Sequence, residues 1–262
     1  MHRGRASETA RRVAAQRLTF PRRETDYGDP TADERLARDV AAGIDATDSP
    51  LRAYLQARTQ FFDTVVVESI ARGIKQIVVG AAGYDGRAWR YRKPDVAWFE
   101  VDHPSTQRDK LDRLEALGID SAEVRFIGAD FAVDPLAVPL KHAGLDPNQA
   151  TLFLLEGVAV YLEGATLEAV LREFSDLAGP GSVLAISLSV SSESPDTGER
   201  RRQFQAAVAR MGEPARSTIE QDQVGALLSR TGWRLSDRVA PDDATQARRA
   251  AAGLVVAVPR GG

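Results

Sequence analysis

The sequence of 262 residues has no cysteine and only three histidines, and each shortage excludes a kind of chemistry. Without cysteine there is neither a disulfide framework nor a thiolate nucleophile. With only His2, His103 and His142 to supply imidazole, no zinc or other metal site is expected. No apolar run approaches the ~20 residues that a membrane-spanning helix requires, so no contact with a membrane is predicted.

Positive charge comes almost entirely from arginine, and the formal net charge at pH 7 is −3. That balance gives no electrostatic reason to bind nucleic acid. The first 23 residues are rich in arginine, which superficially resembles a transit peptide. The ordinary interpretation is a genome that favours arginine over lysine, and we expect a cytoplasmic bacterial protein. The sequence predicts no oligomeric state.

Alternating apolar runs and helical stretches follow one long predicted helix. Ser49 would cap this helix, Pro50 would take its first position, and Gly73 would end it. The apolar runs then fall at residues 76–80, 96–101, 124–129, 151–155 and 182–190, the last after a helical stretch at 165–178. This order predicts an α/β fold with a parallel, doubly wound sheet.

The turn after the first run carries small residues, and the second run ends in acids. A small-residue turn followed by a run that ends in acids favours a cofactor with an adenosine end. Small residues let the backbone approach a ligand, and an acid can hold the ribose diol. Glycines at 80, 83 and 86 do not match the G-x-G-x-x-G spacing of dinucleotide sites. Asp85 would also place negative charge near a phosphate. S-adenosyl-L-methionine therefore fits better than a nicotinamide dinucleotide.

Six motifs in order resemble the leucine carboxyl methyltransferase family, in particular its small bacterial branch of S-adenosylmethionine-dependent O-methyltransferases. The resemblance extends from about residue 7 to the end, and 7–23 is similar to the family's amphipathic opening helix. One departure is Ala81, which replaces the first glycine of the family's Gly-Ala-Gly turn. The motifs are Arg58-Thr59-Gln60-Phe61-Phe62-Asp63, Asp85-Gly86-Arg87-Ala88-Trp89-Arg90, Glu100-Val101-Asp102-His103-Pro104, Gly128-Ala129-Asp130-Phe131, Leu155-Glu156-Gly157-Val158-Ala159-Val160-Tyr161-Leu162 and Met211-Gly212-Glu213-Pro214.

This resemblance implies the class I methyltransferase fold, a Rossmann-like seven-stranded sheet whose last strands lie near 233–239 and 253–258. It also implies an N-terminal helical segment and a lid insertion after the fifth strand. We expect one domain over 1–262, with a helical part (1–73), a cofactor-binding core (74–190), the lid (191–230) and the C-terminal strands (231–262).

The resemblance also assigns cofactor-binding roles. Arg58 stands on the apolar stripe of the long helix and would bind the methionine carboxylate, unless it pairs with a buried acid or extends past the stripe. Asp102 would bind the ribose, although alternation puts Glu100 on the same face and leaves it as the alternative. The remaining assignments are Ala81 and Gly83 in the turn, Asp130 and Phe131 at the adenine, where Asp130 is otherwise a turn residue, and Glu156 on the cofactor.

The catalytic residues are not readable, and Tyr161 and His103 are the candidates. Tyr161 would either reach the acceptor or only pack, and His103 would be a base for a phenol or alcohol or simply part of a turn. A carboxylate acceptor needs no base, because it is already ionised at neutral pH. We therefore predict carboxyl O-methylation of a small molecule, an anionic one if the predicted lid arginines attract it: Arg200, Arg201, Arg202, Arg210 and Arg216.

Three alternative functions stay open. The first is O-methylation of a phenol or alcohol. The second is a nicotinamide-dependent oxidoreductase, against which the sequence has no tyrosine followed four residues later by lysine. The third is a protein that binds the cofactor without catalysis.

Overall fold

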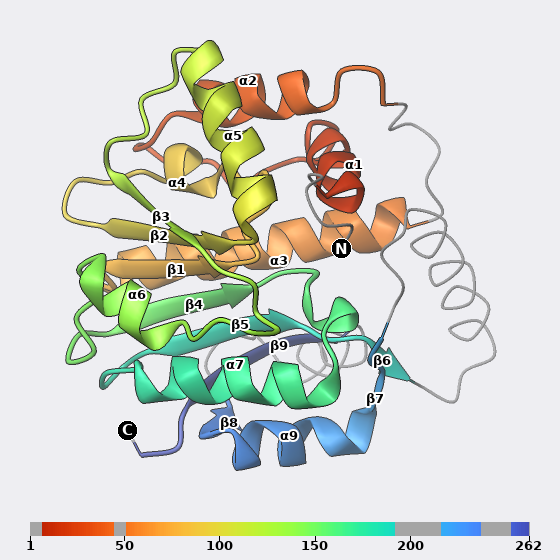
Figure 1. The fold of residues 1–262 in the computed structure, drawn as a ribbon, viewed down its shortest axis with the longest axis vertical. Helices are drawn as coiled ribbons and strands as arrows, with labels where there is room; N and C mark the ends of the chain where they lie inside the picture. The colour runs from red at the N-terminus through yellow and green to blue at the C-terminus, as the bar shows by residue number, and fades with distance from the viewer. Residues whose placement is uncertain (1–6, 45–50, 192–215, 237–252, 262) are drawn as a thin grey trace.

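The apolar runs become the strands of a seven-stranded sheet that carries helices on both faces (Figure 1). This computed structural model describes residues 7–44, 51–191, 216–236 and 253–261. The strand order is β3-β2-β1-β4-β5-β9-β8. The strands are β1 (Gln76–Gly80), β2 (Ala97–Asp102), β3 (Val124–Gly128), β4 (Thr151–Leu155), β5 (Val183–Ser187), β8 (Trp233–Leu235) and β9 (Leu254–Pro259).

The sheet is mixed, whereas the alternation predicted a parallel one. The first five strands are parallel, as expected, but β9 is antiparallel to β5 and to β8. β9 lies between β5 and β8, the three-residue strand that precedes it in the chain. The predicted class I arrangement with seven strands is confirmed.

The helices form two layers that bury separate apolar clusters (Figure 1). One face of the sheet is covered by α1 (Glu8–Arg17), α2 (Pro30–Val40), α3 (Arg52–Ala71), α4 (Arg87–Arg90) and α5 (Pro104–Ala116). The other face is covered by α6 (Ala137–His142), α7 (Gly164–Asp176) and α9 (Val224–Arg230). The short elements are β6 (Val190–Ser191), β7 (Ile219–Glu220), η1 (Ala159–Tyr161) and η2 (Gln221–Gln223).

The N-terminal helices differ from expectation in three places. The opening helix ends at Arg17 rather than residue 23, because the following chain turns Phe20 into the core. The long helix α3 has Leu51 as its N-cap, so the predicted Ser49 cap is wrong; Ser49 itself lies outside the described residues. The helix α2 was not predicted, although Asp29 caps it through Thr31 and Ala32.

The predicted lid lies partly outside the described residues. Residues 192–215, with Arg200, Arg201, Arg202 and Arg210, are among those not described. Its last part, α9, packs on the sheet through the buried Val224, Leu227 and Leu228. Arg216 is exposed and its Nη1 lies 3.3 Å from Glu163 Oε1. A lid role for 191–230 and the single-domain assignment stay predictions.

The described residues lack two kinds of feature. None of the described helices is long and apolar enough to cross a membrane. Within the same residues, no group of three or more acids, histidines or cysteines is placed to hold a metal ion.

Candidate functional site

The candidate site lies where the strand order reverses direction, at the carboxyl ends of β1, β2 and β4. Gly80 ends β1 and is in register with Val101 on one side and with Leu155 on the other. Asp102 and Glu156 therefore follow on either side of the turn that leaves β1. In open α/β sheets, ligands bind outside the carboxyl ends of the strands at this switch point.

The turn after β1 has a left-handed backbone at two positions. Gly83 has φ +51°, which costs a glycine little, whereas Ala81 has φ +53° and carries a side chain. The turn brings the Gly83 N–H to Asp102 Oδ2 and the Ala82 N–H to the Val101 carbonyl, 3.1 Å apart. An added Cβ on Gly80 would lie 2.7 Å from Leu155 Cδ2, so a larger residue here would force the Leu155 side chain to shift.

Asp102 and Glu100 share a face of β2, as alternation predicted, but they have different partners. Glu100 is bound by Lys110, with 2.5 Å between Oε2 and Nζ, and Lys110 also donates to the Asp85 carbonyl. Asp102 accepts from two backbone groups, Gly83 N–H and His103 N–H. Glu100 is therefore engaged inside the protein, while Asp102 lies at the turn.

Both acids have a raised pKa, because burial disfavours the charged form. Burial raises the pKa of Glu100 to about 7 even though Lys110 opposes the shift. The pKa of Asp102 is also raised by burial, against the two backbone N–H groups that stabilise its anion.

Asp130 and Phe131 lie just beyond the end of β3. Asp130 Oδ1 accepts from the Ala132 N–H at 3.0 Å, which is the turn role left open in the sequence. The Phe131 ring approaches the end of β1, since a Cβ on Gly80 would lie 3.3 Å from its Cζ. The chain thus brings Phe131, from beyond β3, to the end of β1.

Glu156, directly after β4, is the centre of a cluster of arginines. Arg58 of α3 bonds its Oε1 through Nε at 3.0 Å. Arg87 and Arg17 reach its Oε2 at 2.6 and 2.9 Å. Arg58 also packs its guanidinium on Gly157 and lies over the Tyr54 ring. Arg58 is thus paired with a buried acid, which was one of its two predicted roles.

Arg87 links this cluster to a larger buried ion network. Its side chain is 1% exposed and contacts Asp63, Asp85 and Glu156 at 2.7, 2.5 and 2.6 Å. Further ion pairs connect Asp63 to Arg22 and Asp33 to both Arg22 and Arg90. We call this set the arginine network: Arg17, Arg22, Arg58, Arg87, Arg90, Asp33, Asp63, Asp85 and Glu156.

The acids around Arg87 remain ionised despite their burial. Burial alone would raise the pKa of Glu156, but Arg17, Arg87 and Arg58 hold that pKa well below its usual range. In the same way Arg87 and Arg22 lower the pKa of Asp63 to about 2. These carboxylates are fixed negative charges at neutral pH.

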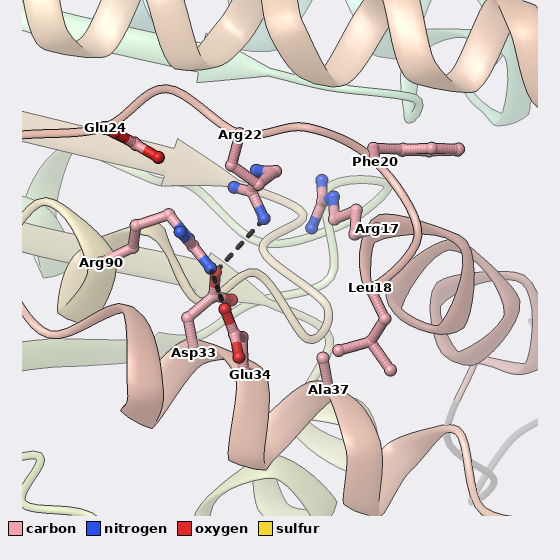
Figure 2. A pocket seen from close by; sticks show the side chains of 9 residues that line it. All are labelled: Arg17, Leu18, Phe20, Arg22, Glu24, Asp33, Glu34, Ala37 and Arg90. Carbon is pink, nitrogen blue, oxygen red and sulfur yellow. Dashed lines mark hydrogen bonds and ion pairs between the residues drawn. The ribbon is translucent and has the colours of Figure 1, made fainter.

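A cavity of about 200 Å³ lies between the end of α1, the chain after it, α2 and α4 (Figure 2). We call it the N-terminal cavity. Its lining residues are Arg17, Leu18, Phe20, Arg22, Glu24, Asp33, Glu34, Ala37 and Arg90. A second cavity of about 200 Å³, the C-terminal cavity, is lined by Ala159, Gly164, Leu167, Glu168, Leu188, Ser189, Ser217, Thr218, Ile219, Gln223, Leu227 and Arg230.

The two catalytic candidates lie on different elements. His103 is the N-cap of α5, and its Nδ1 is occupied by Ser105, with 2.8 Å to Oγ and 3.3 Å to the backbone N. The local geometry thus gives His103 a turn role. Tyr161 ends η1 and is close enough to Arg58 to contribute to the raised pKa of that guanidinium, which places Tyr161 near the arginine network.

Sequence reasoning missed Arg17 and most of the arginine network. It also treated Asp85 as a negative charge that would repel a phosphate. The structure shows that Asp85 is not an isolated charge, because Arg87 contacts it from Nη1 at 2.5 Å and from the backbone N–H at 2.9 Å. The Asp85-x-Arg87 spacing was the available signal for this pair.

Comparison with known proteins gives one family. The family model for leucine carboxyl methyltransferase matches residues 6–175. A proposed S-adenosyl-L-methionine-dependent methyltransferase of Mycolicibacterium paratuberculosis is 30% identical over 209 residues, which are 74% of this chain and 66% of that protein. One from Mycobacteroides abscessus is 32% identical over 206 residues, 76% of this chain and 67% of that protein.

A second protein from Mycobacteroides abscessus is 33% identical over 172 residues, which are 63% of this chain and 55% of that protein. Among solved structures, a proposed methyltransferase from Thermobifida fusca has a TM-score of 0.64 at 17% identity, covering 98% of this chain and 96% of its own. A DUF574 family protein from Streptomyces avermitilis has a TM-score of 0.61 at 18% identity, covering 97% and 98%. These two structures support the fold.

Proposed function

Because the chain belongs to the leucine carboxyl methyltransferase family, a family of S-adenosylmethionine-dependent methyltransferases, we propose that it methylates a carboxyl group of a small molecule. The observation that carries the proposal is the pair of charged sites on either side of the turn after β1. Asp102 lies on one side, and Arg58 with Glu156 lies on the other. The cofactor has a ribose at one end and an amino acid at the other, so the two sites match its two polar ends.

Asp102 holds the ribose in this proposal. It is placed beside the turn, and its buried carboxylate has hydrogen-bond capacity beyond the two backbone groups that it accepts from. Glu100 is less suited because Lys110 already binds it. The small turn residues Ala81 and Gly83 allow the close approach, and Phe131, with Asp130, would face the adenine.

Arg58 and Glu156 hold the methionine end. A guanidinium binds a carboxylate with a planar fork, and an ionised glutamate accepts from an ammonium group. Arg87 keeps Glu156 in place and ionised through its 2.6 Å contact. Arg58 is buried, and Glu156 offsets the burial so that the pKa of Arg58 is raised and its charge persists.

The cofactor, when bound, supplies a methyl group that passes to an acceptor oxygen while the carbon–sulfur bond breaks and its electron pair remains on sulfur. The protein has to align the acceptor and exclude water. A carboxylate acceptor arrives ionised, so no protein base is required. This agrees with a His103 whose Nδ1 is occupied by Ser105.

Calorimetry with S-adenosylhomocysteine, NAD and NADP tests the cofactor. We expect S-adenosylhomocysteine to bind, and tighter binding of a nicotinamide dinucleotide would refute the assignment. Arg58→Ala and Asp102→Asn each remove a charge-assisted contact, so each should weaken binding about ten- to a hundredfold. Glu100→Gln is the matched control for Asp102→Asn and should change affinity much less. If Glu100→Gln weakened binding more than Asp102→Asn, Glu100 would be the residue that binds the ribose.

The acceptor is tested with candidate acids and product analysis. A methyl ester is cleaved by mild alkali, whereas a methyl ether resists it. An alkali-stable product would contradict the carboxyl assignment and direct attention to Tyr161 and His103 as bases. Cofactor binding without turnover for any acceptor would support a non-catalytic protein.

A further inference from the structure

The N-terminal cavity is adjacent to the proposed methionine end, and Arg17 connects the two. Arg17 lines the cavity, and its Nη2 lies 2.9 Å from Glu156 Oε2 and 3.5 Å from Asp85 Oδ2. A ligand in this cavity would therefore be separated from Glu156 by a single side chain.

The walls of the N-terminal cavity have one apolar and one charged part (Figure 2). Leu18, Phe20 and Ala37 supply the apolar part, and arginines with their acids supply the rest. The volume is about 200 Å³. An apolar cavity of roughly 150 Å³ is enough to hold benzene. The cavity thus has room for one ring or a short branched chain.

The arginines of this cavity are not equally satisfied. Arg22 is bound by Asp63 and Asp33, and Arg90 is bound by Asp33. Arg17 has its Nε–H buried with no acceptor among the described residues, and its side chain is only 10% exposed. An unpaired buried N–H is unfavourable, and an anionic oxygen would satisfy it once the guanidinium turns toward the cavity.

The C-terminal cavity lacks this arrangement. Its arginine, Arg230, is 47% exposed and already bonds Glu168 through Nε at 2.8 Å. The C-terminal cavity lies between α7, α9 and the chain near Ser217, on the other face of the sheet from the N-terminal cavity. The positive charge in its lining is therefore half-exposed and already paired with Glu168, so it offers a buried anion no unpaired cation.

We propose that the N-terminal cavity is the acceptor pocket, and that Arg17 binds there the carboxylate of a small aromatic or branched aliphatic acid. This proposal rests on the proposed function, since it presumes that the cofactor lies at Arg58 and Glu156. Arg17 selects the negative charge, and Leu18, Phe20 and Ala37 contact the apolar body of the acid.

Benzoate and benzamide are suitable probes, because they have nearly the same shape and only benzoate is charged. Binding is measured by saturation-transfer NMR and calorimetry with S-adenosylhomocysteine present. We expect benzoate to bind at least tenfold more tightly than benzamide. Ala37→Leu fills the N-terminal cavity and should weaken benzoate at least tenfold. Thr218→Leu fills the C-terminal cavity and should leave benzoate binding unchanged.

Arg17 is tested through the ratio of the two affinities. Arg17→Gln should reduce the preference for benzoate over benzamide to about one, and Arg17→Lys should retain part of it because the charge remains. Because Arg17 contacts Glu156, the affinity for S-adenosylhomocysteine is measured on each variant. The ratio of the probes is insensitive to a general loss of folding, which would affect both alike.

Several results would overturn the proposal. These are failure of benzoate to bind, equal binding of benzamide, or a loss caused by Thr218→Leu in place of Ala37→Leu. If Ala37→Leu weakens S-adenosylhomocysteine instead of benzoate, the cavity belongs to the cofactor. Failure of the proposed function is seen separately, as absence of S-adenosylhomocysteine binding to the unaltered protein.

Discussion

The pKa values of two pairs of buried acids near the turn after β1 are shifted in opposite directions. On the β2 side, burial raises the pKa of Glu100 to about 7 and also raises that of Asp102. In the arginine network, the pKa values of Glu156, after β4, and of Asp85, just before α4, are lowered although both are buried. Burial therefore does not decide the charge of these groups.

The counter-charges explain the difference. Glu100 has one buried cation, Lys110, which is shared with a backbone carbonyl. Glu156 has Arg17, Arg58 and Arg87 around it. Attraction to a single cation does not offset the effect of lost hydration on the pKa of Glu100. Attraction to three guanidinium groups outweighs that effect at Glu156. The β4 side is thus a permanently charged region, whereas on the β2 side the pKa of Glu100 is raised to about 7.

The largest effect is expected from removing the centre of the arginine network. Arg87→Met leaves Asp63, Asp85 and Glu156 buried without their shared cation, and should reduce the free energy of unfolding by about 3–5 kcal/mol. Urea unfolding measures the loss. Arg72→Met is the control, since Arg72 forms an exposed i,i+4 pair with Glu68 and should cost less than about 0.5 kcal/mol. Similar losses for the two variants would mean that the network contributes no more than a surface pair.

The β2 side should be distinguished by its pH dependence. The pKa of Glu100 is raised from 4.5 to about 7 on folding. The contribution of this shift to the free energy of unfolding is therefore complete below about pH 4.5 and is lost as the pH rises through 7. At ~1.4 kcal/mol per pKa unit the loss is about 3 kcal/mol. The opposite case is Asp63, whose pKa is lowered to about 2, so its contribution is lost only as the pH falls below about 4.

Urea unfolding at about pH 5 and about pH 8 tests this window. The unaltered protein should lose stability relative to Glu100→Gln between these two values. The substitution also leaves Lys110 unpaired and lowers stability throughout, so the change with pH is the quantity to compare. Glu115→Gln, on the exposed face of α5, is the control and should follow the unaltered protein. Parallel curves for all three proteins would place the pKa of Glu100 near its ordinary value.

The strands were predictable, because a buried strand is a short apolar run with polar ends. The predicted run 151–155 coincides with β4, and 96–101 differs from β2 by one residue at each end. The prediction failed where the chain packs by long-range contacts. β5 ends at Ser187 rather than residue 190, where the chain continues to β6 and pairs with β7.

Only those features of the site that depend on a local sequence pattern could be predicted. Alternation placed Glu100 and Asp102 on one face, and the stripe of α3 identified Arg58 as unusual. No local pattern joins Lys110 to Glu100, or Arg22 to Asp63 across 41 positions of sequence. Such pairs depend on how α1, α3 and α5 pack on the sheet, so the partners of a buried charge are seen only in the structure.

The smallest expected effect concerns the turn that gives Asp102 its backbone donor. Ala81 has φ +53°, a conformation that costs a residue with a Cβ about 1–2 kcal/mol. Ala81→Gly removes this strain but adds freedom to the unfolded chain, worth roughly 0.5–1 kcal/mol. The net result should be a gain of up to about 1 kcal/mol in the free energy of unfolding. Ala81→Val should lose stability, because a β-branched residue fits the left-handed region poorly. If Ala81→Gly instead lowers stability, the alanine methyl group contributes packing that exceeds the strain, and the β2 side depends on side-chain contacts as well as on its backbone donors.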